Sequence, residues 1–122
     1  MSPIANDAKA AYESGDFSRA LTLFTSLAES GDPQAQLVIG DMYAQGQGIE
    51  KDVIKAVDWF KKSAENGQAL AQSRMGHAYF NGLGVPQDYS LTIEWYKKAA
   101  AQEHVESPVS YTHLTLPTIL LV

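Results

Sequence analysis

The feature that most constrains this chain is an internal repeat with a period of 36 residues. Ten positions recur in order without insertion, first as Ala35, Gly40, Tyr43, Gly46, Gly48, Asp52, Trp59, Lys61, Lys62 and Ala64, and then as Ala71, Gly76, Tyr79, Gly82, Gly84, Asp88, Trp95, Lys97, Lys98 and Ala100. A period of about 20 to 50 residues is typical of solenoids, in which one supersecondary unit stacks on copies of itself. Solenoids usually bind partners along an extended surface, so the repeat also bears on function.

Each repeat is expected to form a helix hairpin, because its apolar residues recur at helical intervals on either side of a glycine-rich stretch. The first thirty residues carry a shorter version, in which only three residues separate Tyr12 from Asp16. The six expected helices cover residues 3–14, 17–30, 33–45, 52–66, 69–81 and 89–102. The predicted fold is therefore all-α: an α/α solenoid of three antiparallel hairpins.

Four glycines interrupt the helical pattern in the middle of the two long repeats, namely Gly46, Gly48, Gly82 and Gly84. A dinucleotide-binding loop would need a preceding strand and a third glycine, and both are absent from the pattern. The glycines are instead expected to supply positive φ where the chain turns back. Trp59 and Trp95 follow the helical spacing of the apolar residues, which favours packing in the core over a role as ligand platforms.

The segment at residues 71–100, AQSRMGHAYFNGLGVPQDYSLTIEWYKKAA, resembles the Sel1-like repeat, a relative of the tetratricopeptide repeat with a longer turn. Residues 33–67 and 69–104 are interpreted as two such repeats, and residues 7–31 resemble a tetratricopeptide hairpin. The resemblance implies a right-handed superhelix within a repeat domain at 1–107, with a concave face lined by the first helix of each hairpin. It also implies a non-enzymatic adaptor or scaffold role. Glu103 departs from the pattern, because Gly31 and Gly67 end the earlier hairpins.

The resemblance also suggests which residues face a partner in the concave groove. Carried over through Gly40 and Gly76, the groove positions are Gln34, Leu37, Asp41, Ala44, Leu70, Ser73, His77 and Phe80. They hold one acidic residue, an apolar strip, and no lysine or arginine. We therefore expect a peptide or helix that docks by apolar contact rather than a clamp for a carboxylate. His77 has no nearby catalytic partner in the sequence, and no catalytic residue is predicted.

Composition narrows the function classes further. The net charge of −5 argues against binding to nucleic acids or anionic membranes, which require a basic surface. Because the chain has no cysteine, it can form neither disulfides nor thiolate metal sites. We also expect no metal, no cofactor and no membrane insertion. The alternative class is a small-molecule binder or hydrolase-like protein related to cysteine-rich β-lactam-binding repeat proteins, whose disulfides this chain lacks. If Met1 is the true start, the protein is cytoplasmic; if a leader was lost upstream, it is periplasmic or secreted.

The last residues, 108–122, do not continue the repeat and contain no charged side chain. Residues 109–122 resemble the translation of a transposase-type sequencing adapter that ends in a stop codon after Val122. We therefore expect a non-native or disordered tail, and a native coding sequence that was interrupted near Ser107. The chain would then be a fragment of a longer repeat protein. A genuine apolar C-terminal strand or interaction tail is the alternative.

Overall fold

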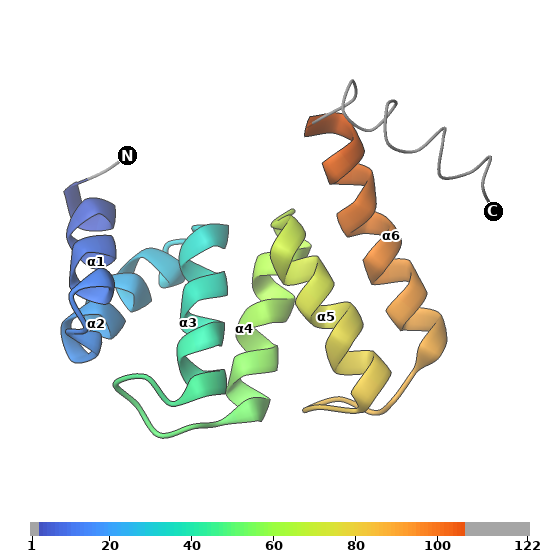
Figure 1. The fold of residues 1–122 in the computed structure, drawn as a ribbon, viewed down its shortest axis with the longest axis horizontal. Helices are drawn as coiled ribbons and strands as arrows, with labels where there is room; N and C mark the ends of the chain where they lie inside the picture. The colour runs from blue at the N-terminus through green and yellow to red at the C-terminus, as the bar shows by residue number, and fades with distance from the viewer. Residues whose placement is uncertain (1–2, 107–122) are drawn as a thin grey trace.

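The computed structural model describes residues 3–106, which form helices and loops and contain no strand (Figure 1). The helices are α1 Pro3–Glu13, α2 Phe17–Glu29, α3 Pro33–Gln45, α4 Val53–Glu65, α5 Ala69–Asn81 and α6 Tyr89–Glu106. The predicted six-helix, all-α fold is confirmed, and α6 alone extends well past its expected end. The adapter-like segment lies outside the described residues.

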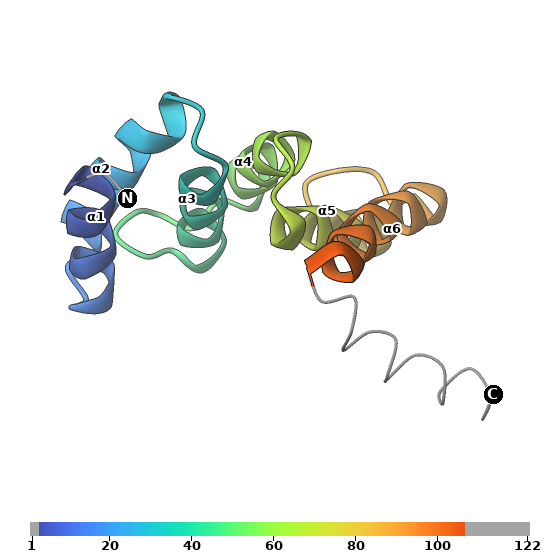
Figure 2. The same cartoon turned by 90° about the horizontal axis from the view of Figure 1, so that it is seen from above.

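The six helices follow one another as a row of hairpins along the long axis of the molecule (Figures 1 and 2). Each helix packs against the helix before it and the helix after it in the chain, and no contact of comparable extent joins the two ends of the row within residues 3–106. This nearest-neighbour packing is what defines a solenoid.

Acidic or amide side chains start five of the six helices by accepting backbone N–H groups that have no partner inside the helix. These capping residues are Asp16, Asp32, Asp52, Gln68 and Asp88. Because each cap lies just before the apolar periodicity begins, the sequence could place the helix starts to within about one residue.

The long turns depend on glycine in the left-handed region. Gly46 and Gly82 end α3 and α5 with φ values of 70° and 68°, and Gly48 and Gly84 follow with 74° and 70°. Backbone hydrogen bonds of 2.9 Å, from Asp52 to Tyr43 and from Asp88 to Tyr79, close the two loops. The two long hairpins therefore share one loop geometry.

The core consists of two clusters of buried residues that meet at α3. The first contains Ala8, Ala11, Ala20, Phe24, Ala28, Ala35, Ile39 and Met42. The second contains Leu37, Ala56, Val57, Phe60, Ala64, Ala71, Met75 and Ala78. Since α3 contributes opposite faces to the two clusters, it joins the first hairpin to the second.

The two tryptophans lie at the edges of these clusters. Trp59 is half-buried against the first cluster, and Trp95 is half-buried against the second. The ammonium group of Lys62 lies 4.4 Å from the centre of the Trp59 ring, and that of Lys98 lies 4.5 Å from Trp95. A lysine three residues further along the helix therefore covers one side of each ring, which adds a cation–π contact to its apolar packing.

Candidate partner-binding groove

An open groove of about 600 Å³ lies between α1, α2 and α3. Its floor is apolar and includes Phe24 and Leu27 from α2 and Ala35 and Val38 from α3. Phe24 is buried, whereas Leu27 and Val38 remain partly exposed. The floor can therefore remove apolar side chains of a partner from water.

The rim of this groove is mainly acidic. Its carboxylates are Glu13, Asp32 and Asp41, and its one ammonium group belongs to Lys9. Glu13 and Lys9 are exposed, so both are accessible to a partner. Asp32 caps α3 by accepting the backbone N–H of Gln34 at 3.0 Å. Arg74 of the next hairpin pairs with Asp41. Glu13 and Asp32 therefore exceed Lys9 by one negative charge, and this excess favours a partner with positive charge beside its apolar side chains.

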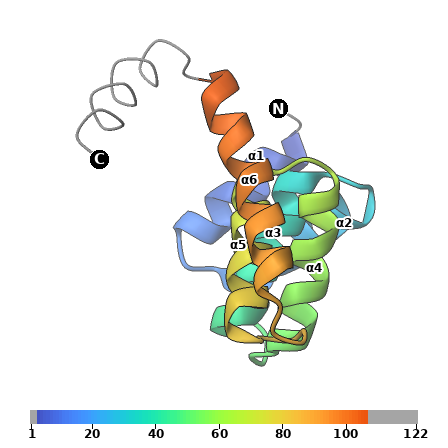
Figure 3. The same ribbon diagram turned by 90° about the vertical axis from the view of Figure 1, so that its right-hand side faces the viewer.

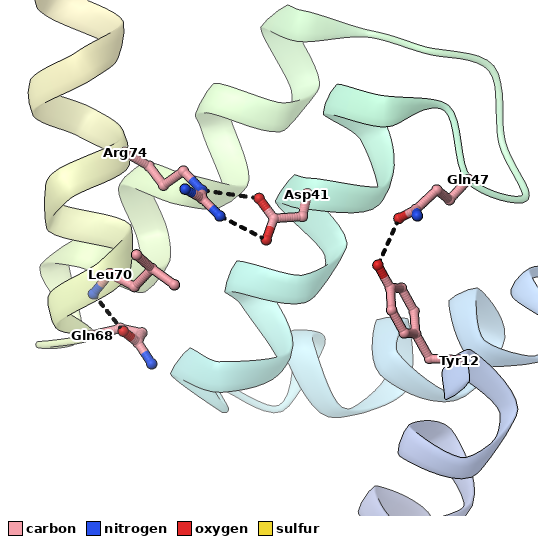
Figure 4. Close-up of polar contacts among 6 residues, drawn as sticks. All are labelled: Tyr12, Asp41, Gln47, Gln68, Leu70 and Arg74. Atoms are coloured by element: carbon pink, nitrogen blue, oxygen red, sulfur yellow. Dashed lines mark hydrogen bonds and ion pairs between the residues drawn. The ribbon is translucent and has the colours of Figure 1, made fainter. Parts of the chain in front are cut away.

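Asp41 links the groove to the neighbouring hairpin through an ion pair (Figure 4). Arg74 on α5 donates from Nε and Nη2 to the two carboxylate oxygens of Asp41, at 3.0 and 3.2 Å. This two-pronged geometry fixes the orientation of the carboxylate more firmly than a single hydrogen bond would. The pair is also partly exposed, so salt screens it.

The α1 side of the groove is held by the glycine loop of the second hairpin. The hydroxyl of Tyr12 donates to Oε1 of Gln47 at 3.0 Å (Figure 4), and the Tyr12 ring meets Phe17 edge-on at 5.3 Å between ring centres. Because Gln47 lies between the two glycines of the loop, the turn that closes the second hairpin also positions a residue of the groove wall.

On α3, the structure brings only part of the predicted site to the groove. Gln34 and Asp41 line it, and Ala44 packs partly buried against the second core cluster. Leu37 requires a correction, because its side chain is 3% exposed and belongs to the core shared with α4 and α5. The sequence assigned it to the partner-facing surface because the sequence alone does not show how the next hairpin covers α3.

The four predicted residues on α5 do not line this groove. Leu70 and Phe80 are 47% and 50% exposed, Ser73 is partly buried, and His77 is exposed. The Phe80 ring packs against Tyr89 at 5.5 Å between ring centres. These residues lie on the last hairpin, one repeat away from the groove.

Sequence reasoning missed the residues that α1 contributes, as well as Arg74. The predicted positions were carried over through Gly40 and Gly76, and the first hairpin has no equivalent register. The spacing of Lys9 and Tyr12 on one helical face was the available signal. The eight predicted positions hold no lysine or arginine, but Lys9 on α1 lines the groove and Arg74 on α5 pairs with Asp41, so basic groups reach this region from outside the predicted set.

Two other kinds of site, a metal-ion cluster and a membrane-spanning helix, are not found in the part of the chain that the structure describes. No group of three or more histidine, aspartate or glutamate side chains is arranged there to hold a metal ion. None of the described helices combines the length and hydropathy that crossing a membrane requires. The exposed His77 lies beside Asn81, whose amide donates to the His77 carbonyl at 3.1 Å.

The row of stacked helix hairpins defines an α/α repeat solenoid, a class of protein that usually binds partners along an extended surface. The family described as Sel1 repeat matches residues 7–32, 33–68 and 69–104, so the chain belongs to the Sel1 repeat family. The match includes the first hairpin, whose turn is the shortest of the three. Sel1 repeats generally serve as protein-interaction modules and typically act as non-enzymatic scaffolds.

Solved structures agree with this assignment. A Sel1 repeat protein from Oxalobacter formigenes superposes with a TM-score of 0.68 at 40% identity, over 70% of this chain and 65% of that one. A protective antigen of uropathogenic Escherichia coli with an SLR fold gives 0.69 at 43% identity, over 74% of this chain. This chain spans only 19% of that antigen.

A more distant structure shares the fold alone. Cysteine-rich protein B of Helicobacter pylori superposes with a TM-score of 0.66 at 19% identity, over 68% of this chain and 62% of that one. A search among curated protein sequences found no match.

Proposed function

We propose that this chain is a non-enzymatic adaptor or scaffold module that binds a peptide or helix of a partner protein in the groove between α1, α2 and α3. The observation that carries the proposal is an apolar floor bordered by more carboxylates than ammonium groups. Burial of apolar side chains on this floor would supply a gross free energy of about 25 cal/mol per Å², part of which offsets the loss of motional freedom on binding. The carboxylates would select the partner's charge.

The partner segment therefore has apolar side chains in a row, flanked by lysine or arginine. Attraction between opposite charges mainly raises the association rate and excludes acidic competitors. It acts on top of apolar contact, which supplies most of the affinity. The chain's overall negative charge acts in the same direction.

Panning a displayed library of short peptides against the full chain tests this proposal. Enriched peptides should combine apolar anchors with basic residues, and their affinity should fall as salt is raised. Glu13→Lys, at an exposed rim position, should weaken these peptides several-fold. Glu65→Lys, at an exposed position on α4 outside the groove, makes the same charge change and should leave binding intact. Equal binding by both variants would refute the groove as the binding site.

We further propose that the chain is part of a longer repeat protein. The Escherichia coli antigen supports this, because the chain matches it at 43% identity while spanning 19% of its length. Sequencing the genomic locus tests the proposal directly. The reading frame should continue past residue 106 with further repeats at the same 36-residue period. A native stop codon directly after Val122 would contradict it.

A further inference from the structure

The two glycine loops both rest on the second helix of the preceding hairpin. A Cβ atom added to Gly48 would lie 2.8 Å from the carbonyl carbon and oxygen of Phe17, the first residue of α2. A Cβ atom added to Gly84 would lie 3.3 Å from the carbonyl oxygen of Val53, the first residue of α4, and 3.1 Å from the Val57 side chain. Phe17 and Val53 are one period apart, so this contact repeats with the sequence.

The same surface for a glycine loop exists a third time, on α6, where nothing in the described structure covers it. Tyr89 and Ile93 are the equivalents of Val53 and Val57, and they are 59% and 55% exposed. Val57, by contrast, is 5% exposed under the loop that contains Gly84. Figure 3 looks at this end of the row, with α6 at the front.

A second contact between hairpins is also left without a partner at this end. Phe60 on α4 is 5% exposed, and the Arg74 guanidinium of the next hairpin lies 5.8 Å from the centre of its ring. The equivalent of Phe60 on α6 is Tyr96, which is 43% exposed. Helix α6 therefore presents both the surface for a glycine loop and the aromatic ring that the first helix of a following hairpin would cover.

Hydrogen bonds between hairpins repeat in the same way. Nε2 of Gln36 donates to the Ala28 carbonyl at 3.1 Å, and Nε2 of Gln72 donates to the Ala64 carbonyl at 3.2 Å. Each glutamine is nearly buried, and each reaches back from a long hairpin to the end of the preceding second helix. The interface between the two long hairpins thus combines a glycine loop, a residue over an aromatic ring, and a glutamine.

The segments that could cover this face of α6 differ in whether they can make these contacts. The first hairpin of a second copy has a turn of only three residues between α1 and α2, and it lacks the long glycine loop. Residues 107–122 number sixteen, whereas a long repeat takes 36. Neither can place a long glycine loop on Tyr89 and Ile93.

We propose that the exposed face of α5 and α6 is the docking surface for a further helix hairpin of the same type, which carries a long glycine loop and follows α6 in the chain. This inference rests on the proposal that the array continues, and it names the contacts that the next repeat makes. Its glycine loop lies on Tyr89 and Ile93, and its first helix covers Tyr96.

A tandem duplication tests this proposal. A second copy of residues 69–104 is inserted after residue 104 of the full chain, which keeps the period of 36. The junction carries Glu103→Gly, because Gly67 occupies the equivalent position between α4 and α5. The extended chain should unfold at a higher temperature than the 122-residue chain.

The decisive measurement is the effect of Ile93→Asp in both chains. In the extended chain, it should raise the unfolding equilibrium constant about tenfold or more, because the charge becomes buried under the added loop. In the 122-residue chain, where Ile93 is 55% exposed, the change should be about twofold or less. Ile54→Asp, at a 64% exposed position on α4, is the matched control and should have a small effect in both chains.

Three results would overturn the proposal. The first is an Ile93→Asp effect that is equally small in both chains. The second is a dimer of the full chain in sedimentation that Ile93→Asp dissociates, because a second copy would then be the occupant. The third is a loss of several degrees in Tm when the chain ends after Glu106, because residues 107–122 would then cover the face. Each result leaves the test with Glu13→Lys in the groove unaffected, and sequencing of the locus tests the continuation of the array separately.

Discussion

Alanine at Gly40 and at Gly76 should affect stability differently, although the two glycines occupy the same position in successive repeats. A Cβ atom at Gly40 would lie 2.5 Å from two ring carbons of Phe60, and one at Gly76 would lie 2.6 Å from two ring carbons of Tyr96. Phe60 is 5% exposed, whereas Tyr96 is 43% exposed. The Tyr96 ring can therefore turn toward solvent, while the Phe60 ring is held by the core.

The magnitudes follow from two opposing terms. Overpacking a buried site costs about 1–3 kcal/mol. Replacing glycine by alanine inside a helix stabilises it by about 1 kcal/mol. Gly40→Ala should therefore destabilise the protein by up to about 2 kcal/mol. Gly76→Ala should be close to neutral or stabilise by up to about 1 kcal/mol, because its clash is relieved cheaply.

Thermal and urea unfolding followed by circular dichroism would measure both effects. For a domain of this size, each kcal/mol shifts Tm by about 4–8 °C. Phe60→Leu provides the control, because Gly40→Ala should cost less when the ring that it contacts has been removed. Equal shifts for the two alanine variants, or a Gly40→Ala effect that Phe60→Leu leaves unchanged, would show that ring burial does not decide the outcome.

Three further experiments test other parts of the structure. Gly48→Val should lower the urea midpoint more than Gly84→Val, and both more than a substitution at the exposed groove residues Lys9 and Glu13, because positive φ costs a side chain about 1–2 kcal/mol and Gly48 also contacts backbone of α2; wild-type midpoints would show that neither position needs glycine. A double-mutant cycle with Asp41→Asn and Arg74→Gln should give a coupling of about 0.2–1 kcal/mol that shrinks in high salt; a salt-independent coupling would contradict a screened pair. Met75→Ala, at a fully buried position, should cost about 2–5 kcal/mol in urea unfolding, and a negligible loss would mean that the second cluster repacks easily.

The helices were predictable because their signals are local. The cap at Asp52 and the glycine at Gly46 act on groups only a few residues away, so they appear in the sequence next to the structure that they determine. The exception is the end of α6, which extends to Glu106, past the position where Gly67 follows α4. Without a glycine at 103, the next strong helix-ending signal in the sequence is Pro108, two residues past the end of α6.

The sequence by itself thus determined the helix hairpins and their repetition, whereas only the tertiary structure decided which residues face a partner. Leu37 lies on the first helix of its hairpin, yet the stacking of the next hairpin buries it, and the same stacking brings Arg74 to Asp41 across 33 residues. The groove also depends on how the short first turn places α1 beside α3, which no single repeat encodes. Contacts between hairpins depend on the angle and spacing of stacked units, and these emerge from the packing of many side chains at once.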